Sequence, residues 1–93
     1  MTQPVQIILL TQSRCGLCDQ AKDVIDRVGR DYPLQITEID LTSLDGQRLA
    51  AEAGVLFAPG VLLADQPFSY GRLSERKLRR ALDQRRQDHH QHA

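Results

Sequence analysis

The spacing of apolar residues takes three different forms in turn along the first part of the chain. The run Val5–Thr11 is almost continuously apolar and rich in β-branched residues, which is typical of a strand buried on both faces. From Gly16 onward, apolar residues recur every three or four positions, which predicts a helix with Gly29 just beyond its end. Leu34–Asp40 alternates with period two and predicts a second strand, parallel to the first. The helical stripe consists of Leu17, Ala21, Val24, Ile25 and Val28.

A second helix is predicted after the second strand. Thr42 or Ser43 is expected to cap this helix, and Ala50 belongs to its small apolar face. Gly46 should weaken the start of the helix by up to about 1 kcal/mol relative to alanine. Gly54 is expected to end the helix in the left-handed conformation.

A hairpin and a last helix complete the pattern. Gly60–Ala64 and Phe68–Tyr70 are predicted to be antiparallel strands joined by a turn at Asp65–Pro67. Ser74 is expected to cap the last helix. The apolar stripe of this helix consists of Leu78, Ala81 and Leu82.

The predicted order of elements is therefore β-α-β-α-β-β-α. An α/β fold with a mixed four-stranded sheet, flanked by helices on both faces, is the simplest way to bury these stripes. A chain of 93 residues is enough for one domain. We expect residues 1–86 to form that domain and the polar residues 87–93 to form a flexible tail.

Charge is balanced overall but unevenly distributed. Acidic residues predominate in residues 1–71 and basic residues in residues 72–93. We interpret the basic end as a solvated helix face and expect no nucleic-acid binding, because no aromatic residue follows Tyr70 for bases to stack on. No stretch approaches the roughly 20 apolar residues of a membrane helix, and the chain begins unlike a signal peptide. The expected location is the cytoplasm, with no membrane partner.

The two cysteines of the chain form the motif Cys15-Gly16-Leu17-Cys18, which lies between the first predicted strand and the first predicted helix. Residues three apart on a helix share a face, with Cβ atoms about 5–6 Å apart. A disulfide needs Cα atoms about 4.4–6.8 Å apart, so this pair can bond or part with little backbone motion. In a reducing compartment, such a placement favours a reversible redox pair over a static bridge.

The start of the helix gives the two cysteines different roles. Cys15 is expected where free N–H groups and the helix dipole favour an anion, so the pKa of its thiol should lie below the roughly 8.5 of a free cysteine. Cys15 is then the attacking thiolate, and Cys18, one turn inside the helix, is the resolving thiol. Arg14 adds positive charge, and Gly16 leaves room for the backbone of a partner.

Other interpretations of the cysteine pair stay open. A zinc site needs four ligands, and the only other candidates in the chain are His89, His90 and His92, far along in the polar tail. No metal ligand is therefore expected within one chain. A metal or cluster shared between two chains is an alternative.

These motifs resemble those of the thioredoxin superfamily, nearer to the glutaredoxin-like proteins, from Val5 to about Leu82. Cys15 and Cys18 follow the first strand, as in the family, and Gly54-Val55-Leu56-Phe57-Ala58-Pro59 is similar to the family pattern Gly-Val-x-x-x-Pro. Gly71 precedes the last helix, as the family's glycine does.

The resemblance implies further site residues. The family's proline is cis and faces the cysteines, which implies the same for Pro59, and Ala58 would offer its backbone to an extended partner. The predicted substrate-binding residues are Arg14, Gly16, Leu17, Ala58, Pro59 and Gly71.

The sequence also departs from the family. Leu9 replaces the buried acid of thioredoxins, and Arg14 replaces their tryptophan. The glutathione-binding pattern of glutaredoxins is reduced to Gly71–Ser74. The cations that could pair with glutathione carboxylates are Arg14, Arg48 and Arg72.

The function that the sequence favours is a glutaredoxin- or thioredoxin-like disulfide reductase with Cys15 and Cys18 as catalytic residues. It would reduce a protein disulfide or a low-molecular-weight disulfide, with electrons from a reductase or from glutathione and with no bound cofactor. One alternative is a non-catalytic redox sensor, or a thioredoxin-like module that holds a metal or an iron–sulfur cluster. Another is an adaptor that binds a partner through Arg79 and Arg80 of the basic helix.

Overall fold

Seven elements alternate along the chain in the predicted order. The computed structural model describes the backbone of residues 3–91 and the side chains of residues 3–86. The elements are β1 (Val5–Thr11), α1 (Gly16–Gly29), β2 (Leu34–Asp40), α2 (Leu44–Ala53), β3 (Gly60–Leu63), β4 (Gln66–Tyr70) and α3 (Glu75–Gln91). The helix predicted at the end of the chain thus continues to Gln91, and the expected domain limit at residue 86 stays a prediction.

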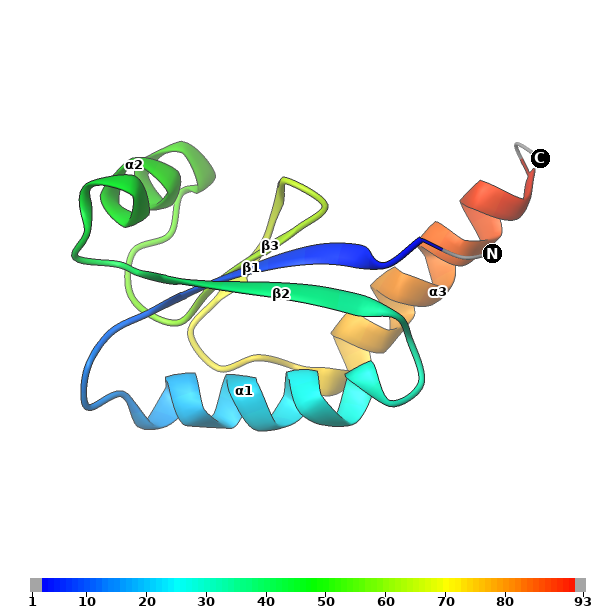
Figure 1. Ribbon diagram of the computed structural model, residues 1–93, viewed down its shortest axis with the longest axis horizontal. Coiled ribbons are helices and arrows are strands. Elements are labelled where there is room, and N and C mark those ends of the chain that lie inside the picture. Colours follow the sequence, from blue (N-terminus) through cyan, green and yellow to red (C-terminus); the bar gives the residue numbers. More distant parts are fainter. Residues whose placement is uncertain (1–2, 92–93) are drawn as a thin grey trace.

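The four strands form one mixed sheet in the order β2-β1-β3-β4. β1 and β2 are parallel along their whole length, whereas β3 is antiparallel to both β1 and β4. Figure 1 shows α1 and α2 on opposite sides of the sheet. In the same view, α3 begins near the C-terminal end of α1 and runs away from it. The predicted α/β architecture is confirmed.

Two cores lie on the two faces of the sheet. Ile7 and Leu9 of β1 pack on one face with residues of α1 and α3, among them Val24 and Leu78. Leu10 packs on the other face against Ala50 and other residues of the α2 side. Because alternate residues of a strand point to opposite faces, a strand with helices on both sides needs an unbroken apolar run. The composition of β1 therefore explains its central position.

The first helix differs from its prediction at both ends. Leu17 was expected on the buried stripe, but it is 38% exposed, and Cys18 occupies the buried position instead. Gly29 was expected just beyond the helix, but it is the last helical residue, and Arg30 follows as the cap in a right-handed conformation. The helix therefore ends without the left-handed glycine that the sequence suggested.

The hairpin turn also differs from its prediction. The turn residues are Ala64 and Asp65, both with positive φ (50° and 66°), and β4 begins at Gln66. This geometry fits a two-residue hairpin loop, whose twist matches that of the strands. Pro67 lies within β4 rather than in the turn and pairs with Leu62. β4 is an edge strand. Such a strand tolerates proline, which has no N–H group to donate to a neighbouring strand.

The second helix begins as the sequence predicts, but its glycine has a different role. Ser43, rather than Thr42, is the cap, and its Oγ accepts the N–H of Gly46 at 3.0 Å. A Cβ on Gly46 would overlap the carbonyl oxygen of Asp40. Gly46 is thus required by a close approach of backbone, instead of merely weakening the helix. Gly54 ends the helix with φ of 72°, as expected.

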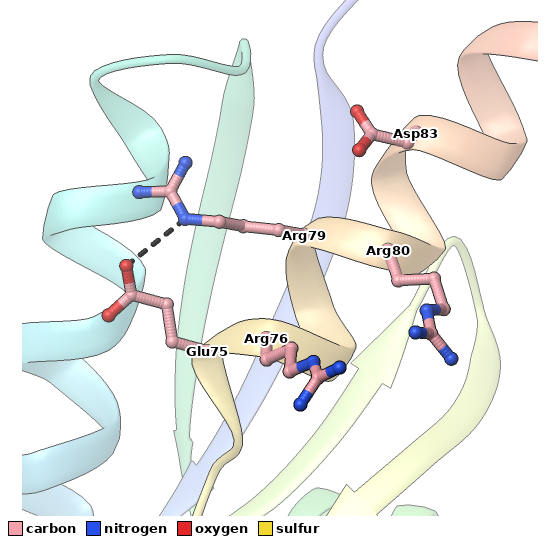
Figure 2. Close-up of a pocket in the computed structure, with 5 residues that line it drawn as sticks. All are labelled: Glu75, Arg76, Arg79, Arg80 and Asp83. Carbon is pink, nitrogen blue, oxygen red and sulfur yellow. Dashed lines mark hydrogen bonds and ion pairs between the residues drawn. The ribbon is translucent and has the colours of Figure 1, made fainter.

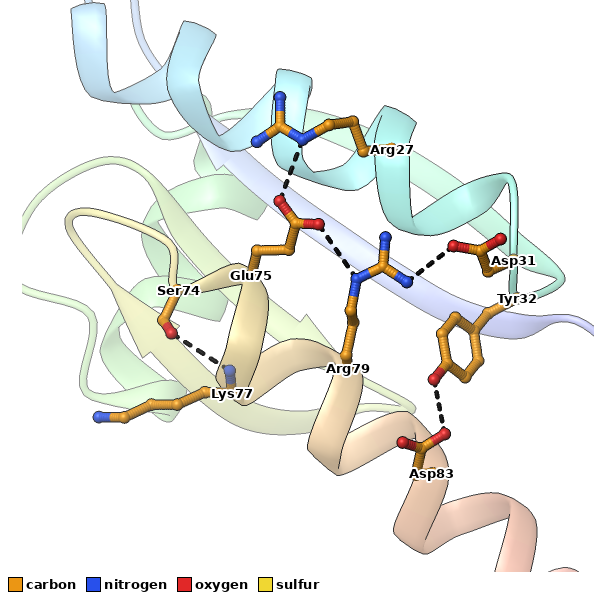
Figure 3. A network of polar contacts seen from close by, with 8 residues as sticks. All are labelled: Arg27, Asp31, Tyr32, Ser74, Glu75, Lys77, Arg79 and Asp83. Atoms are coloured by element: carbon orange, nitrogen blue, oxygen red, sulfur yellow. Dashed lines mark hydrogen bonds and ion pairs between the residues drawn. The ribbon is translucent and has the colours of Figure 1, made fainter.

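A polar network fastens α3 to α1 and to the loop that follows it (Figure 3). Glu75 accepts the Nε–H groups of Arg27 and Arg79, each at 3.0 Å, and Arg79 also donates to Asp31 at 2.8 Å. The hydrogen bond from Arg27, and then that from Arg79, lowers the pKa of the Glu75 carboxyl. Arg79 is therefore occupied within the fold, although the adaptor hypothesis gave it to a partner.

Replacing Glu75 with glutamine should destabilise the protein more at neutral pH than in acid. Because the folded pKa is depressed, the stabilisation is present above the unfolded value of 4.5 and is lost as pH falls through the folded pKa. Urea unfolding at neutral pH and at about pH 3 should show a larger difference between wild type and variant at neutral pH than in acid. Glu52→Gln, on the exposed face of α2, is the control. A difference of equal size at both pH values would contradict this assignment.

Candidate active site

Cys15 caps α1 with its own sulfur. Its backbone is extended (φ −118°, ψ 101°), and its Sγ accepts the backbone N–H of Cys18 at 3.0 Å. The carbonyl oxygen of Cys15 accepts the N–H of Asp19 at 3.2 Å, which begins the ladder of the helix. The first N–H groups of a helix have no partner within it, so a sulfur at this position satisfies one of them. The predicted position of Cys15 at the start of the helix is therefore found.

The two cysteines form a disulfide in this structure, with Cα atoms 5.1 Å apart. Cys18 is only 2% exposed, whereas Cys15 is half-buried. A reagent or partner that approaches from solvent therefore meets Cys15 first. This asymmetry agrees with the different roles that the sequence predicts for the two sulfurs.

The residues around Cys15 form an open rim. Arg14 is exposed and left-handed (φ 54°), a conformation that costs a non-glycine residue roughly 1–2 kcal/mol and redirects the chain just before the helix. A Cβ on Gly16 would meet no heavy atom within 4 Å, so the space above it is open. Leu17 is partly exposed beside it. These three predicted residues lie together at the first turn of α1.

The strands bring the other predicted residues, Ala58, Pro59 and Gly71, to the end of the sheet from which β1 leads to Cys15. Leu10, at the end of β1, pairs with Gly60, and Gly60 also pairs with Tyr70, at the end of β4. The end of β1, which leads to Cys15, is therefore beside the start of β3, which follows Pro59. The Ala58–Pro59 peptide bond is cis, and both residues are buried.

Gly71 fastens this second group. Its N–H donates to the carbonyl oxygen of Pro59 at 2.8 Å, and its φ is 79°. A Cβ there would lie 3.0 Å from a ring carbon of Phe57, so the absence of a side chain serves both the backbone conformation and the packing of Phe57. Three cations were considered for glutathione. Arg48 lies on α2, where it pairs with Asp45. Arg14 and Arg72 adjoin Cys15 and Gly71 in the chain.

Gln20 was not singled out from the sequence. Its side-chain amide donates to the carbonyl oxygen of Leu73 at 3.0 Å and accepts the N–H of the same residue at 3.1 Å. This pair of hydrogen bonds fixes the loop after Gly71 to α1, at a position two residues beyond Cys18. Its partner is backbone 53 residues away, so no local sequence signal could reveal it.

Replacing Gln20 with leucine should lower the free energy of unfolding by about 1–3 kcal/mol. The variant leaves the N–H and C=O groups of Leu73 without their partner, and Leu73 is almost completely buried. Urea titration of both proteins measures the difference. The exposed Gln84 of α3 offers a matched control, and Gln84→Leu should change stability little. Equal effects of the two substitutions would contradict the role of Gln20.

Other candidate sites lie elsewhere. A surface hollow of about 580 Å³ runs along α3 (Figure 2). Arg79 and Arg80 of the adaptor hypothesis line it, but none of the predicted catalytic or substrate-binding residues does. Within the described residues, no three His, Cys, Asp or Glu side chains gather where they could hold a metal ion. The side chains of His89 and His90, and the whole of His92, lie outside the described part of the chain. Among the described residues, no helix is long and apolar enough to cross a membrane.

Solved structures with the same fold include a protein of known class. A mutant thioredoxin from Halobacterium salinarum superposes with a TM-score of 0.67 at 20% identity, over 88% of this chain and 74% of its own. A malarial protein gives a TM-score of 0.64 at 18% identity, over 89% of this chain and 97% of its own. A protein of unknown function from Staphylococcus aureus gives 0.59 at 18% identity, over 88% and 91%. At these identities, the likeness establishes a thioredoxin-like fold.

The family rests on a separate comparison. No curated protein sequence matches the chain. The family model described as Glutaredoxin-like domain (DUF836) matches residues 6–83, which include both cysteines, the cis-proline loop and most of the sheet and helices. The chain therefore belongs to the glutaredoxin-like domain family, with a Cys-x-x-Cys pair at disulfide distance on a thioredoxin-like fold.

Proposed function

We propose that this protein is a thiol–disulfide oxidoreductase that works through the Cys15/Cys18 pair. The observation that supports this most is the position of Cys15 as the cap of α1, with its sulfur facing the N–H of Cys18. When the disulfide is reduced, that N–H group and the positive end of the helix favour the thiolate over the thiol. The thiolate is the nucleophile of disulfide exchange.

In the proposed reaction, the Cys15 thiolate attacks one sulfur of a partner disulfide. A bond forms between Cys15 and that sulfur, the partner's S–S bond breaks, and its other sulfur leaves as a thiolate that takes up a proton. Cys18 then loses its proton and attacks the Cys15 sulfur, which restores the Cys15–Cys18 disulfide and releases the second partner thiol. Two electrons thus pass from the dithiol pair to the partner.

The oxidised pair needs two electrons to begin again. We propose glutathione or a reductase as their source, a protein disulfide or a low-molecular-weight disulfide as substrate, and no bound cofactor. A reducing compartment such as the cytoplasm would keep this cycle running. The proposed substrate-binding residues remain those at the open edge around Cys15, Pro59 and Gly71.

Trapping a mixed disulfide tests this proposal. Cys18→Ser keeps the attacking thiolate but removes the resolving thiol, so the variant should accumulate a covalent adduct with its substrate through Cys15. Mass spectrometry of the intact protein after incubation with oxidised glutathione or with insulin whose disulfides are intact measures the adduct. The wild type under the same conditions should show none, because Cys18 resolves it. A variant that forms no adduct with either disulfide would contradict the proposal.

A further inference from the structure

Two of the four aromatic residues of the chain stay outside the core. Tyr32 and Phe68 pack against the larger core, as large apolar side chains usually do. Phe57 is 52% exposed and Tyr70 is 41% exposed, although both precede buried residues at the edge that carries the cysteines. Exposed apolar side chains that are grouped, rather than scattered singly, mark interaction surfaces.

These two rings are held in place despite their exposure. They meet edge to face, with centroids 5.1 Å apart and planes at 88°. The ring of Phe57 also lies over Gly71, whose N–H is bound to Pro59. Little side-chain entropy is left to lose when a partner covers such rings, which makes fixed aromatic side chains effective anchors.

The aromatic pair is continuous with the open rim of Cys15. Tyr70 ends β4 beside the start of β3, which in turn lies beside the end of β1. Residues 54–60, which include Phe57, carry no charge, and the partly exposed Leu17 adds apolar surface at the first turn of α1. Arg14 and Arg72 are exposed cations that adjoin Cys15 and Gly71 in the chain.

We propose that Phe57 and Tyr70 bind an apolar side chain adjacent to the reacting cysteine of a polypeptide disulfide. This inference rests on the proposed function and names its substrate class. Glutathione, with only a glutamyl and a glycyl residue beside its cysteine, has no side chain to cover two rings. A peptide segment does, and an acidic residue within it suits the two exposed arginines that adjoin Cys15 and Gly71 in the chain. The aromatic pair therefore selects polypeptide disulfides with apolar flanks over small polar disulfides.

The experiment compares two peptides in a single turnover. Each carries one acidic residue and one cysteine linked through a disulfide to thionitrobenzoate, and the residue before the cysteine is leucine in one peptide and serine in the other. Reduced protein supplies both electrons, and the absorbance of released thionitrobenzoate gives the second-order rate constant. We expect the wild type to prefer the leucine peptide, and Phe57→Ala or Tyr70→Ala to reduce this preference about tenfold.

Ile36 provides a matched control. It is 42% exposed, close to the value for Tyr70, but it lies on β2 at the opposite edge of the sheet. Ile36→Ala should keep both the rate and the preference of the wild type. Equal wild-type rates for the two peptides, or a preference that survives Phe57→Ala, would overturn the aromatic docking surface alone. A wild type that reacts with neither peptide would overturn the proposed function and this inference with it.

Discussion

Cys15→Ser is expected to reduce disulfide exchange to the uncatalysed rate. A serine hydroxyl at the start of α1 can still accept the N–H of residue 18, so the cap is kept. It is not ionised near neutral pH, however, and it cannot form a mixed disulfide. The buried Cys18 has no comparable access to a partner, since only 2% of its surface is exposed. Reduction of insulin or of a small disulfide, followed with a thiol donor in excess, measures the loss.

The Cys18→Ser variant is the control for Cys15→Ser, because both lack the disulfide but only one keeps the proposed nucleophile. We expect Cys18→Ser to react once with the substrate and Cys15→Ser not to react at all. Turnover by Cys15→Ser at the wild-type rate would show that the Cys15 sulfur is not the nucleophile. The two variants together also separate loss of chemistry from loss of the disulfide cross-link.

Alanine at Gly46 should lower the free energy of unfolding by roughly 1–3 kcal/mol, with a larger loss if the backbone of α2 shifts. The new Cβ would overlap the Asp40 carbonyl oxygen, which belongs to backbone and cannot rotate away. Helix propensity alone predicts the opposite sign, because alanine is favoured over glycine by about 1 kcal/mol in a helix. Urea unfolding decides between the two.

Gly29→Ala supplies the matched comparison. Gly29 is also helical, but its Cβ would meet only the Cδ1 of Leu34 at an ordinary 3.8 Å. We expect this substitution to stabilise the protein by about 0.5–1 kcal/mol. If Gly46→Ala were as stable as Gly29→Ala, the close approach at Gly46 would not exist in solution.

The order of the elements could be predicted because each buried face leaves a local pattern. The almost continuous apolar run of Val5–Thr11 indicates a strand covered on both sides, and β1 is such a strand. The position of Cys15 at the helix start follows from the change of period at Gly16. The resemblance to glutaredoxin-like proteins, carried by the spacing of the cysteines, proline and glycine, is confirmed by the family model.

Features that depend on contacts distant in sequence could not be predicted. The hairpin turn was wrongly placed at Asp65–Pro67 because proline usually marks turns, but at the edge of a sheet it costs no ladder hydrogen bond. From the sequence alone, Gly46 is only a residue that weakens a helix, because the neighbouring Asp40 carbonyl is known only from the structure. The hydrogen bonds between Gln20 and Leu73 and the exposure of Phe57 likewise depend on where α1, β4 and the loops meet.

The pH dependence of alkylation at each cysteine of the reduced protein tests the central claim most directly. Peptide mapping after brief exposure to iodoacetamide gives the rate at Cys15 and at Cys18 separately. We predict that Cys15 reacts much faster and that its rate reaches half-maximum well below the roughly pH 8.5 of a free cysteine. Half-maximal reaction of Cys15 at that pH or above, or faster alkylation of Cys18, would contradict a thiolate held at the start of α1.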